Sequence, residues 1–147
     1  MSILCATFAR AQVTLHLTVP ASTPAGASVF VAGSFNQWNP AATEYRLTAE
    51  GEGRYAITLP NSTPGVPGVI EFKFTLGSWD LVEADSTGAD VANRTFTVSA
   101  TGPASYTGSV PRWRDGTPRP RPASATASVS IVSDSFAIPQ LGRTRRV

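Results

Sequence analysis

The chain has 147 residues, of which 41% are hydrophobic and 15% charged, and a single cysteine, Cys5. This length suffices for one compact domain with tails, while one cysteine excludes an internal disulfide framework and a cysteine-based zinc site. The net charge is +2 and the pI about 9.1, but seven arginines lie from Arg112 to the end and the only lysine is Lys73. A basic tail of this kind argues against a nucleic-acid partner, and no apolar segment is long enough to predict a membrane span.

Residues 1–11 are similar to the end of a secretory signal peptide. An apolar run from Ile3 to Phe8 precedes Ala9-Arg10-Ala11, which fits the small-residue cleavage pattern of such signals. The alternative interpretation is an irregular N-terminal strand. The signal interpretation predicts a remnant at 1–11 and a secreted or periplasmic protein.

Residues 12–99 are predicted to form short strands separated by turns. Apolar and polar side chains alternate from Gln12 to Val19, and again from Val69 to Leu76. Further strands are expected at residues 28–32, 44–48, 54–59, 79–83 and 93–98. About seven short strands with regular turns predict an all-β fold, an immunoglobulin-like antiparallel β-sandwich.

The composition changes after residue 99. Pro103, Pro111 and three later prolines, interspersed with Arg, Ser, Thr and Ala, predict a linker over 100–127 that is extended rather than packed. Residues 128–147 regain strand-like character and are predicted to be the start of a truncated downstream domain.

Residues that would support catalysis or metal binding are sparse. The only histidine is His16, on the polar face of the first predicted strand, and no nucleophile-elbow or phosphate-loop motif occurs. The acidic residues Asp80, Glu83, Asp85 and Asp90 could hold calcium, but their spacing does not match the regular calcium loop, so solvated loop carboxylates are favoured. We expect no catalytic residues, no cofactor and no metal.

Residues suited to binding a sugar are present. Trp38 lies in a polar loop, and Trp79 follows a tight Gly-Ser turn. Lys73 is predicted on the polar face of its strand, and Asn93 begins the final one. Each residue alone is better explained by packing or solvation. Together they predict a surface that offers aromatic rings to sugar faces and polar groups to sugar hydroxyls.

The segment Val29-Phe-Val-Ala-Gly-Ser-Phe-Asn-Gln-Trp-Asn-Pro40 resembles the opening signature of the family 48 carbohydrate-binding modules. Glu71–Phe74, Gly77–Trp79 and Asn93–Val98 resemble the second half of that family, and equally the family 20 starch-binding domains. The resemblance covers residues 27–98. It implies that Trp38 and Trp79 stack on adjacent glucose rings while Lys73 and Asn93 hydrogen-bond sugar hydroxyls. The turn between Lys73 and Trp79 looks one residue shorter than in the kinase glycogen-binding domain of family 48, so the resemblance leaves the angle of the Trp79 ring open.

Residues 133–147 resemble the entry into secreted α/β-hydrolase esterases of the esterase D type. Two hypotheses follow. The first is a monomeric, non-catalytic module that binds α-glucan polysaccharide or oligosaccharide and precedes a downstream α/β-hydrolase domain. The alternative is a structural accessory sandwich that packs against that esterase and binds no sugar. Exposure of Trp38 and Trp79 favours the first, and burial of either ring in the core favours the second.

Overall fold

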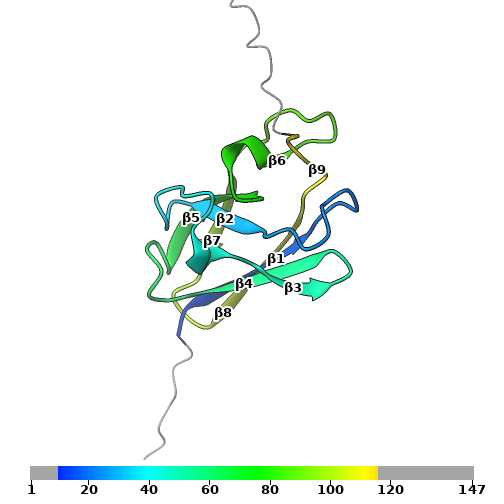
Figure 1. The fold of residues 1–147 in the computed structure, drawn as a ribbon. Coiled ribbons are helices and arrows are strands. Elements are labelled where there is room, and N and C mark those ends of the chain that lie inside the picture. Colours follow the sequence, from blue (N-terminus) through cyan, green and yellow to red (C-terminus); the bar gives the residue numbers. More distant parts are fainter. Residues whose placement is uncertain (1–9, 116–147) are drawn as a thin grey trace, which may run out of the picture. The chain divides into compact units, whose positions relative to one another are not determined.

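The alternating segment near the N-terminus forms the centre of a four-stranded sheet in the computed structural model, which describes residues 10–115. Strand β1 (Gln12–Thr18) buries every second side chain. It pairs antiparallel with β4 (Arg54–Pro60) and parallel with β8 (Pro103–Ser109), and β3 (Thr48–Gly51) lies beyond β4 at the edge. The order is therefore β3-β4-β1-β8, as Figure 1 shows.

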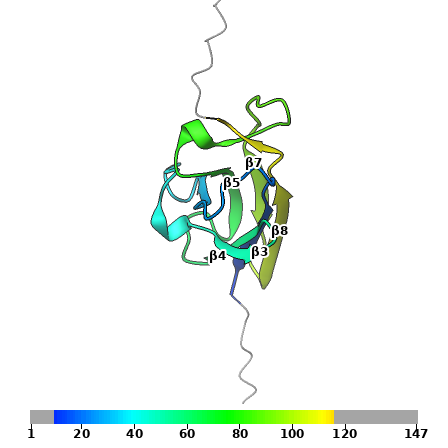
Figure 2. The ribbon, with the colours of Figure 1, turned by 45° about the vertical axis from the view of Figure 1, so that its right-hand side comes forward.

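A second sheet has the order β2-β5-β7 and is antiparallel throughout (Figure 2). Its strands are β2 (Phe30–Gly33), β5 (Gly68–Thr75) and β7 (Arg94–Val98). Two short strands, β6 (Glu83–Ala84) and β9 (Arg112–Trp113), pair separately. Two single-turn 3₁₀ helices complete the regular structure, η1 (Thr43–Tyr45) and η2 (Trp79–Leu81).

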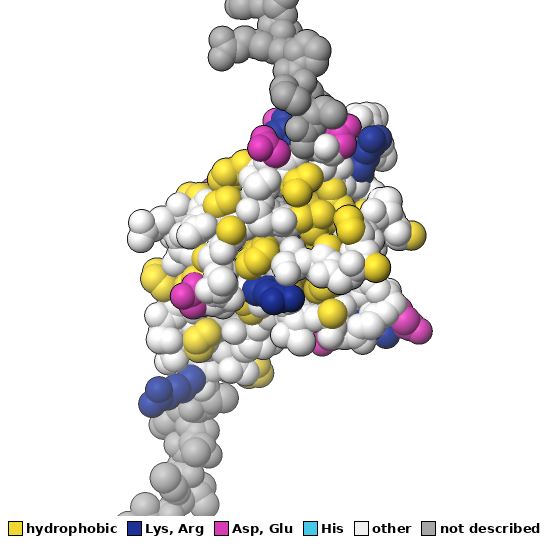
Figure 3. All heavy atoms as spheres, viewed as in Figure 1, with side chains coloured by type: hydrophobic (Ala, Val, Ile, Leu, Met, Phe, Trp, Pro, Cys, Tyr) yellow, Lys and Arg dark blue, Asp and Glu magenta, His cyan; other side chains and the backbone are white. Residues whose placement is uncertain are grey.

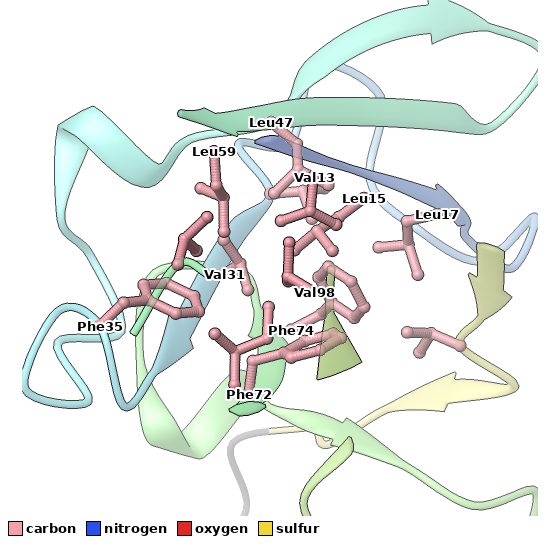
Figure 4. Close-up of a cluster of buried hydrophobic side chains, with 14 of the residues drawn as sticks. Val13, Leu15, Leu17, Val31, Phe35, Leu47, Leu59, Phe72, Phe74 and Val98 are labelled. Carbon is pink, nitrogen blue, oxygen red and sulfur yellow. The ribbon is translucent and has the colours of Figure 1, made fainter. Parts of the chain in front are cut away.

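The core lies between the two larger sheets. Figure 4 shows side chains of β1 and β4 meeting those of β2, β5 and β7. Phe72 and Phe74 of β5 are fully buried, and the ring of Phe72 packs edge-on against Tyr106 of β8, with 5.1 Å between centroids. Burying each large apolar side chain contributes about 1.5–3 kcal/mol. The predicted all-β sandwich is confirmed, with one parallel pair, β1 and β8.

Two of the expected strands differ from the structure. Residues 44–48 were predicted to be a strand, but η1 occupies Thr43–Tyr45 and β3 begins only at Thr48. Residues 79–83 contain η2 and only the first residue of β6. Both segments are too short for alternation to distinguish a strand from one helical turn.

The prediction of an unpacked linker over 100–127 is wrong for the part up to residue 113, which contains β8 and β9. Strand β8 lies within the sandwich, pairing with β1 along seven residues, and Trp113 of β9 is buried, its indole N–H donating to Thr23 Oγ1 at 2.9 Å. Prolines are tolerated here because Pro103 begins an edge strand and Pro111 lies just outside it, where no ladder donor is needed.

The predicted signal remnant and downstream domain fall mainly outside the described residues. Arg10 forms a β-bridge with Thr101, and Ala11 is buried in the core. Residues 1–9, the rest of the predicted linker and all of 128–147 are outside the described range. Within residues 10–115, no helix has the length and apolar character needed to cross a membrane.

Candidate functional site

The turn that follows β2 is built around the side chain of Asn36. Its Oδ1 accepts a hydrogen bond from the Gly33 amide at 2.8 Å, and its Nδ2 donates to the Val31 carbonyl at 3.0 Å. The Gly33 carbonyl in turn accepts the amides of Asn36 and Trp38 at 3.1 and 3.0 Å. An asparagine that bonds its own backbone in this way closes a turn without a regular ladder. The turn therefore holds Trp38 in a defined place.

Further contacts fix this turn to β5. The Ser34 amide donates to the Glu71 carbonyl at 2.9 Å, and Ser34 Oγ accepts the Glu71 amide at 3.2 Å. Thr75 Oγ1 donates to the Pro40 carbonyl at 2.6 Å. Phe35 is buried in the core. The loop is thus anchored at both ends and in the middle, and it folds back over the sheet.

The backbone of the turn is close-packed and locally strained. A Cβ added at Gly33 would lie 2.4 Å from the Glu71 carbonyl oxygen, so no other residue fits without a shift of the backbone. Gln37 and Trp38 have φ of 56° and 58°, a left-handed conformation that is unfavourable for residues with side chains. Strained residues persist only where the surrounding structure holds them, and they cluster at functional sites. Here one of the strained residues is Trp38 itself.

The second tryptophan is carried by the turn that follows β5. Gly77 adopts φ of +96°, and η2 follows directly. The Leu76 amide donates to the Leu81 carbonyl at 3.1 Å, which closes the loop around the 3₁₀ turn. The side chain of Trp79 projects outward and is 40% exposed. An exposed tryptophan on a closed turn loses little further freedom when it contacts a ligand.

The two indoles lie against each other at the surface. The ring centroids of Trp38 and Trp79 are 6.3 Å apart and the ring planes are inclined at 40°. Trp38 is half-buried and Trp79 exposed, so neither belongs to the core. The pair therefore forms one bent apolar surface.

Polar groups lie on the outer face of the sheet formed by β2, β5 and β7. Lys73 is half-buried and Asn93 exposed. The register of β5 and β7 ends at the pair Phe72–Arg94, and Lys73 and Asn93 are the next residues beyond that pair. Asn93 Nδ2 donates to Glu71 Oε2 at 3.2 Å, which directs the remaining amide oxygen away from this carboxylate. The face thus offers an ammonium donor beside amide and carboxylate acceptors.

Charges are scattered on the face of the molecule seen in Figure 3, where basic and acidic side chains are separated by hydrophobic and uncharged polar groups. Such a surface suits a neutral ligand with both apolar faces and hydroxyls better than a polyanion.

Over 104 residues the chain is 48% identical to an α-amylase of Niallia circulans, a match covering 71% of this chain and 8% of that enzyme. Two amylopullulanases, from Thermoanaerobacter thermohydrosulfuricus and Thermoanaerobacterium thermosulfurigenes, are each 38% identical over 108 and 109 residues. These matches cover 71% of this chain but only 7% and 6% of the two enzymes. The chain therefore spans only a small part of the length of the curated relatives it matches. No known protein-family model matches it.

The structure places the predicted site residues on two features, an indole pair and the outer face of a sheet. Trp38 and Trp79 are in contact, while Lys73 and Asn93 lie on the outer face of the sheet whose strands lead into both turns. Glu71, which no prediction assigned to the site, lies on the same face and holds Asn93. Alternation along β5 already put Glu71 on the side of Lys73, but no sequence pattern indicated its partner.

The acidic residues after Trp79 do not act as one group. Among residues 10–115, no three acidic, His or Cys side chains are placed to share a metal ion. Asp85 Oδ1 accepts three hydrogen bonds within its own loop, and those from Thr87 and Ala89 hold the pKa of Asp85 below its ordinary value. Asp90 pairs with Arg114 at 3.1 Å.

Glu83 was expected to be a solvated loop carboxylate, and this is wrong. It is 1% exposed and forms an ion pair with Arg94. Burial opposes the charge of Arg94, but the hydrogen bonds and charge of Glu83 outweigh that effect, so the pKa of Arg94 lies above its ordinary value. A buried carboxylate needs such a partner, and the sequence did not reveal which arginine supplies it.

Proposed function

We propose that residues 10–115 form a non-catalytic module that binds α-glucan of the starch or glycogen type. The contact between Trp38 and Trp79 at the surface carries this proposal. Two turns, one strained and one tightly closed, hold two large apolar rings at the surface. Exposed apolar surface of this kind is typical of a site that a ligand covers.

The arrangement fits the chemistry of a glucan. Each glucose ring has a weakly apolar face that an indole can cover, and hydroxyls at its edge that need donors and acceptors. Lys73 supplies donors, and Asn93 and Glu71 supply acceptors. The inclination of 40° between the indoles suits a curved α-linked chain, whose successive rings turn, better than a flat ribbon of coplanar rings.

The relatives support the same ligand class. The enzymes that contain similar segments are an α-amylase and two amylopullulanases, whose names refer to α-glucans. Because the similar segment is a small part of each enzyme, an accessory role suits it better than a catalytic one. We also propose attachment to a catalytic domain and, from the signal-like residues 1–11, a secreted or periplasmic location. The esterase resemblance of residues 133–147 remains a prediction, since these residues lie outside the described range.

The expected affinity is modest. A shallow surface that contacts two or three sugars gives a dissociation constant of ~10 μM to 1 mM. Loss of one indole removes about 1–3 kcal/mol, which weakens binding about 5- to 150-fold.

Native affinity electrophoresis tests the proposal. The wild type should be retarded in gels that contain soluble starch, and folded Trp38→Ala and Trp79→Ala variants should not be. Arg54→Ala is the control, because this exposed side chain belongs to β4 in the other sheet, and it should migrate like the wild type. Retention of binding in both folded tryptophan variants would overturn the site. Absence of retardation in the wild type would favour the structural accessory role.

A further inference from the structure

A buried carboxylate lies beside the C-terminal part of β5, the strand that carries Lys73. Glu83 Oε1 accepts the Phe74 amide at 3.1 Å, and both carboxylate oxygens accept the Arg94 Nε–H, at 3.0 and 2.8 Å. The Arg94 Nη2 group also donates to Glu83 Oε2. No buried side-chain polar atom within residues 10–115 lacks a partner. Glu83 therefore makes several charge-assisted hydrogen bonds at once.

Arg94 extends this network to the opposite sheet. Its Nη1 donates to Tyr106 Oη at 2.8 Å, and its Nη2 donates to the Ser109 carbonyl at 2.7 Å, both in β8. The guanidinium carbon lies 5.3 Å from the centroid of the Phe74 ring. A planar guanidinium with five donors is suited to hold several elements in fixed geometry.

The groups that Glu83 contacts are neighbours of the proposed site residues. Phe74 follows Lys73 in β5, and Arg94 follows Asn93 at the start of β7. Glu83 itself begins β6, and only Val82 separates it from the helical turn that carries Trp79. One carboxylate thus joins the three segments that bear these residues.

We propose that Glu83 is a positioning residue that, through Arg94 and the Phe74 amide, fixes the relative placement of Trp79, Lys73 and Asn93. This inference rests on the proposed function, since it concerns the same face. An apolar core of similar volume would often be as stable as a buried ion pair, so stability alone does not account for Glu83 here. Directional hydrogen bonds fix positions in a way that apolar contacts do not, and a binding constellation must be held to within about 0.5 Å.

Glu83→Gln is the principal test, because glutamine keeps the shape and removes the charge. Maltoheptaose affinity by calorimetry should fall about tenfold, measured at a temperature where thermal unfolding shows the variant to be folded. Val98→Ala is the matched control: this buried side chain lies at the end of β7 remote from Asn93. It should lower the unfolding temperature and leave the affinity unchanged.

A second readout needs no sugar. The near-UV circular dichroism band of the Trp38–Trp79 pair, defined as wild type minus Trp79→Ala, should diminish in Glu83→Gln and persist in Val98→Ala. If Glu83→Gln is not folded, Arg94→Lys replaces it, because lysine keeps the charge and loses the planar contacts.

The outcomes separate the two proposals. If the wild type binds and the folded Glu83→Gln variant binds equally well with an unchanged dichroism band, the positioning role is overturned. If the wild type fails to bind maltoheptaose, the proposed function fails, and the dichroism band alone decides whether Glu83 positions Trp79. If the Val98→Ala control loses affinity as much as Glu83→Gln, the effect follows stability in general and the positioning role is likewise overturned.

Discussion

Trp38 and Trp79 meet although the strands that precede them run in opposite directions. Gly33 at the end of β2 pairs with Phe72, whereas Thr75 at the end of β5 pairs with Phe30. The two turns therefore start at different positions along the sheet. The turn after β2 bridges that gap by folding back until the Pro40 carbonyl reaches Thr75. The indole contact depends on this return of the loop.

We predict that the two tryptophans act as one unit. In a double-mutant cycle on maltoheptaose binding, the variant Trp38→Ala/Trp79→Ala should lose less than the sum of the single losses, with a coupling of about 0.5–3 kcal/mol. The physical reason is that each ring supports the other at 6.3 Å, so removal of one already disables the platform. Calorimetry of the four proteins checks this. Strictly additive losses would show instead two independent contact sites.

Gln37 provides a test of the strain in the turn. It is exposed, and its φ of 56° suits glycine, so Gln37→Gly should raise the free energy of unfolding by up to about 1 kcal/mol. Gln37→Val should lower it, because a branched side chain adopts this conformation poorly. Urea denaturation measures both.

The matched control for Gln37 is Gln12→Gly, at an exposed residue of β1. Glycine in a strand is destabilising, so the same substitution should there lower the stability by about 0.5–1 kcal/mol. A loss of stability in Gln37→Gly similar to that in Gln12→Gly would mean that the left-handed conformation carries no cost at this position.

Much of the fold was predictable because its signals are local. Alternation along β1 and β5 identified the buried residues directly, and the Gly-rich hairpin between β3 and β4 was evident from the sequence. Strand β8 was not predicted, because its outward residues are Ser and Thr, its inward residues include Gly108, and prolines lie at or beside its ends. Its place is set by pairing with β1, which is distant in the sequence.

The candidate site was predictable in part for the same reason. The polar surroundings of Trp38 indicated a surface tryptophan, and alternation placed Lys73 outward. The contact between Trp38 and Trp79 and the hydrogen bond between Asn93 and Glu71 depend on the return of a loop and on strand register. No periodicity encodes these. The burial of Glu83 depends likewise on a partner in another strand.

Gly33 should not tolerate a side chain. In Gly33→Ala the new Cβ would lie 2.4 Å from the Glu71 carbonyl oxygen and 2.8 Å from the Phe35 ring, and the backbone atom cannot give way cheaply. We expect a loss of about 2–3 kcal/mol in the free energy of unfolding, together with weaker starch retardation. Thermal and urea unfolding measure the first effect.

Gly26→Ala is the control for Gly33→Ala. Gly26 has a left-handed φ of +76°, but nothing lies within 4 Å of an added Cβ. Gly26→Ala should lower the free energy of unfolding only by the cost of a left-handed alanine, about 1 kcal/mol. Its starch retardation should be unchanged. Equal effects of the two substitutions on both readouts would remove the steric explanation.

Asp85 should titrate below its ordinary pKa of 3.8. Its Oδ1 accepts the Thr87 hydroxyl at 2.6 Å and the amides of Thr87 and Ala89 at 2.8 Å, and these bonds favour the charged form. A carboxyl whose pKa is lower in the folded than in the unfolded state contributes stability above the unfolded value. That contribution is lost as the pH falls through the folded value. The loop should therefore loosen only below pH 3.8.

An NMR titration of the Asp85 carboxyl measures this directly, and the amide signals of Thr87 and Ala89 should move with the same midpoint. Thr87→Ala removes the largest favourable contact and should raise the midpoint toward 3.8. Ser86→Ala, at the exposed residue between Asp85 and Thr87, should leave the midpoint unchanged. A wild-type midpoint at or above 3.8 would show that burial of the carboxyl, which acts in the opposite direction, outweighs the hydrogen bonds of the loop.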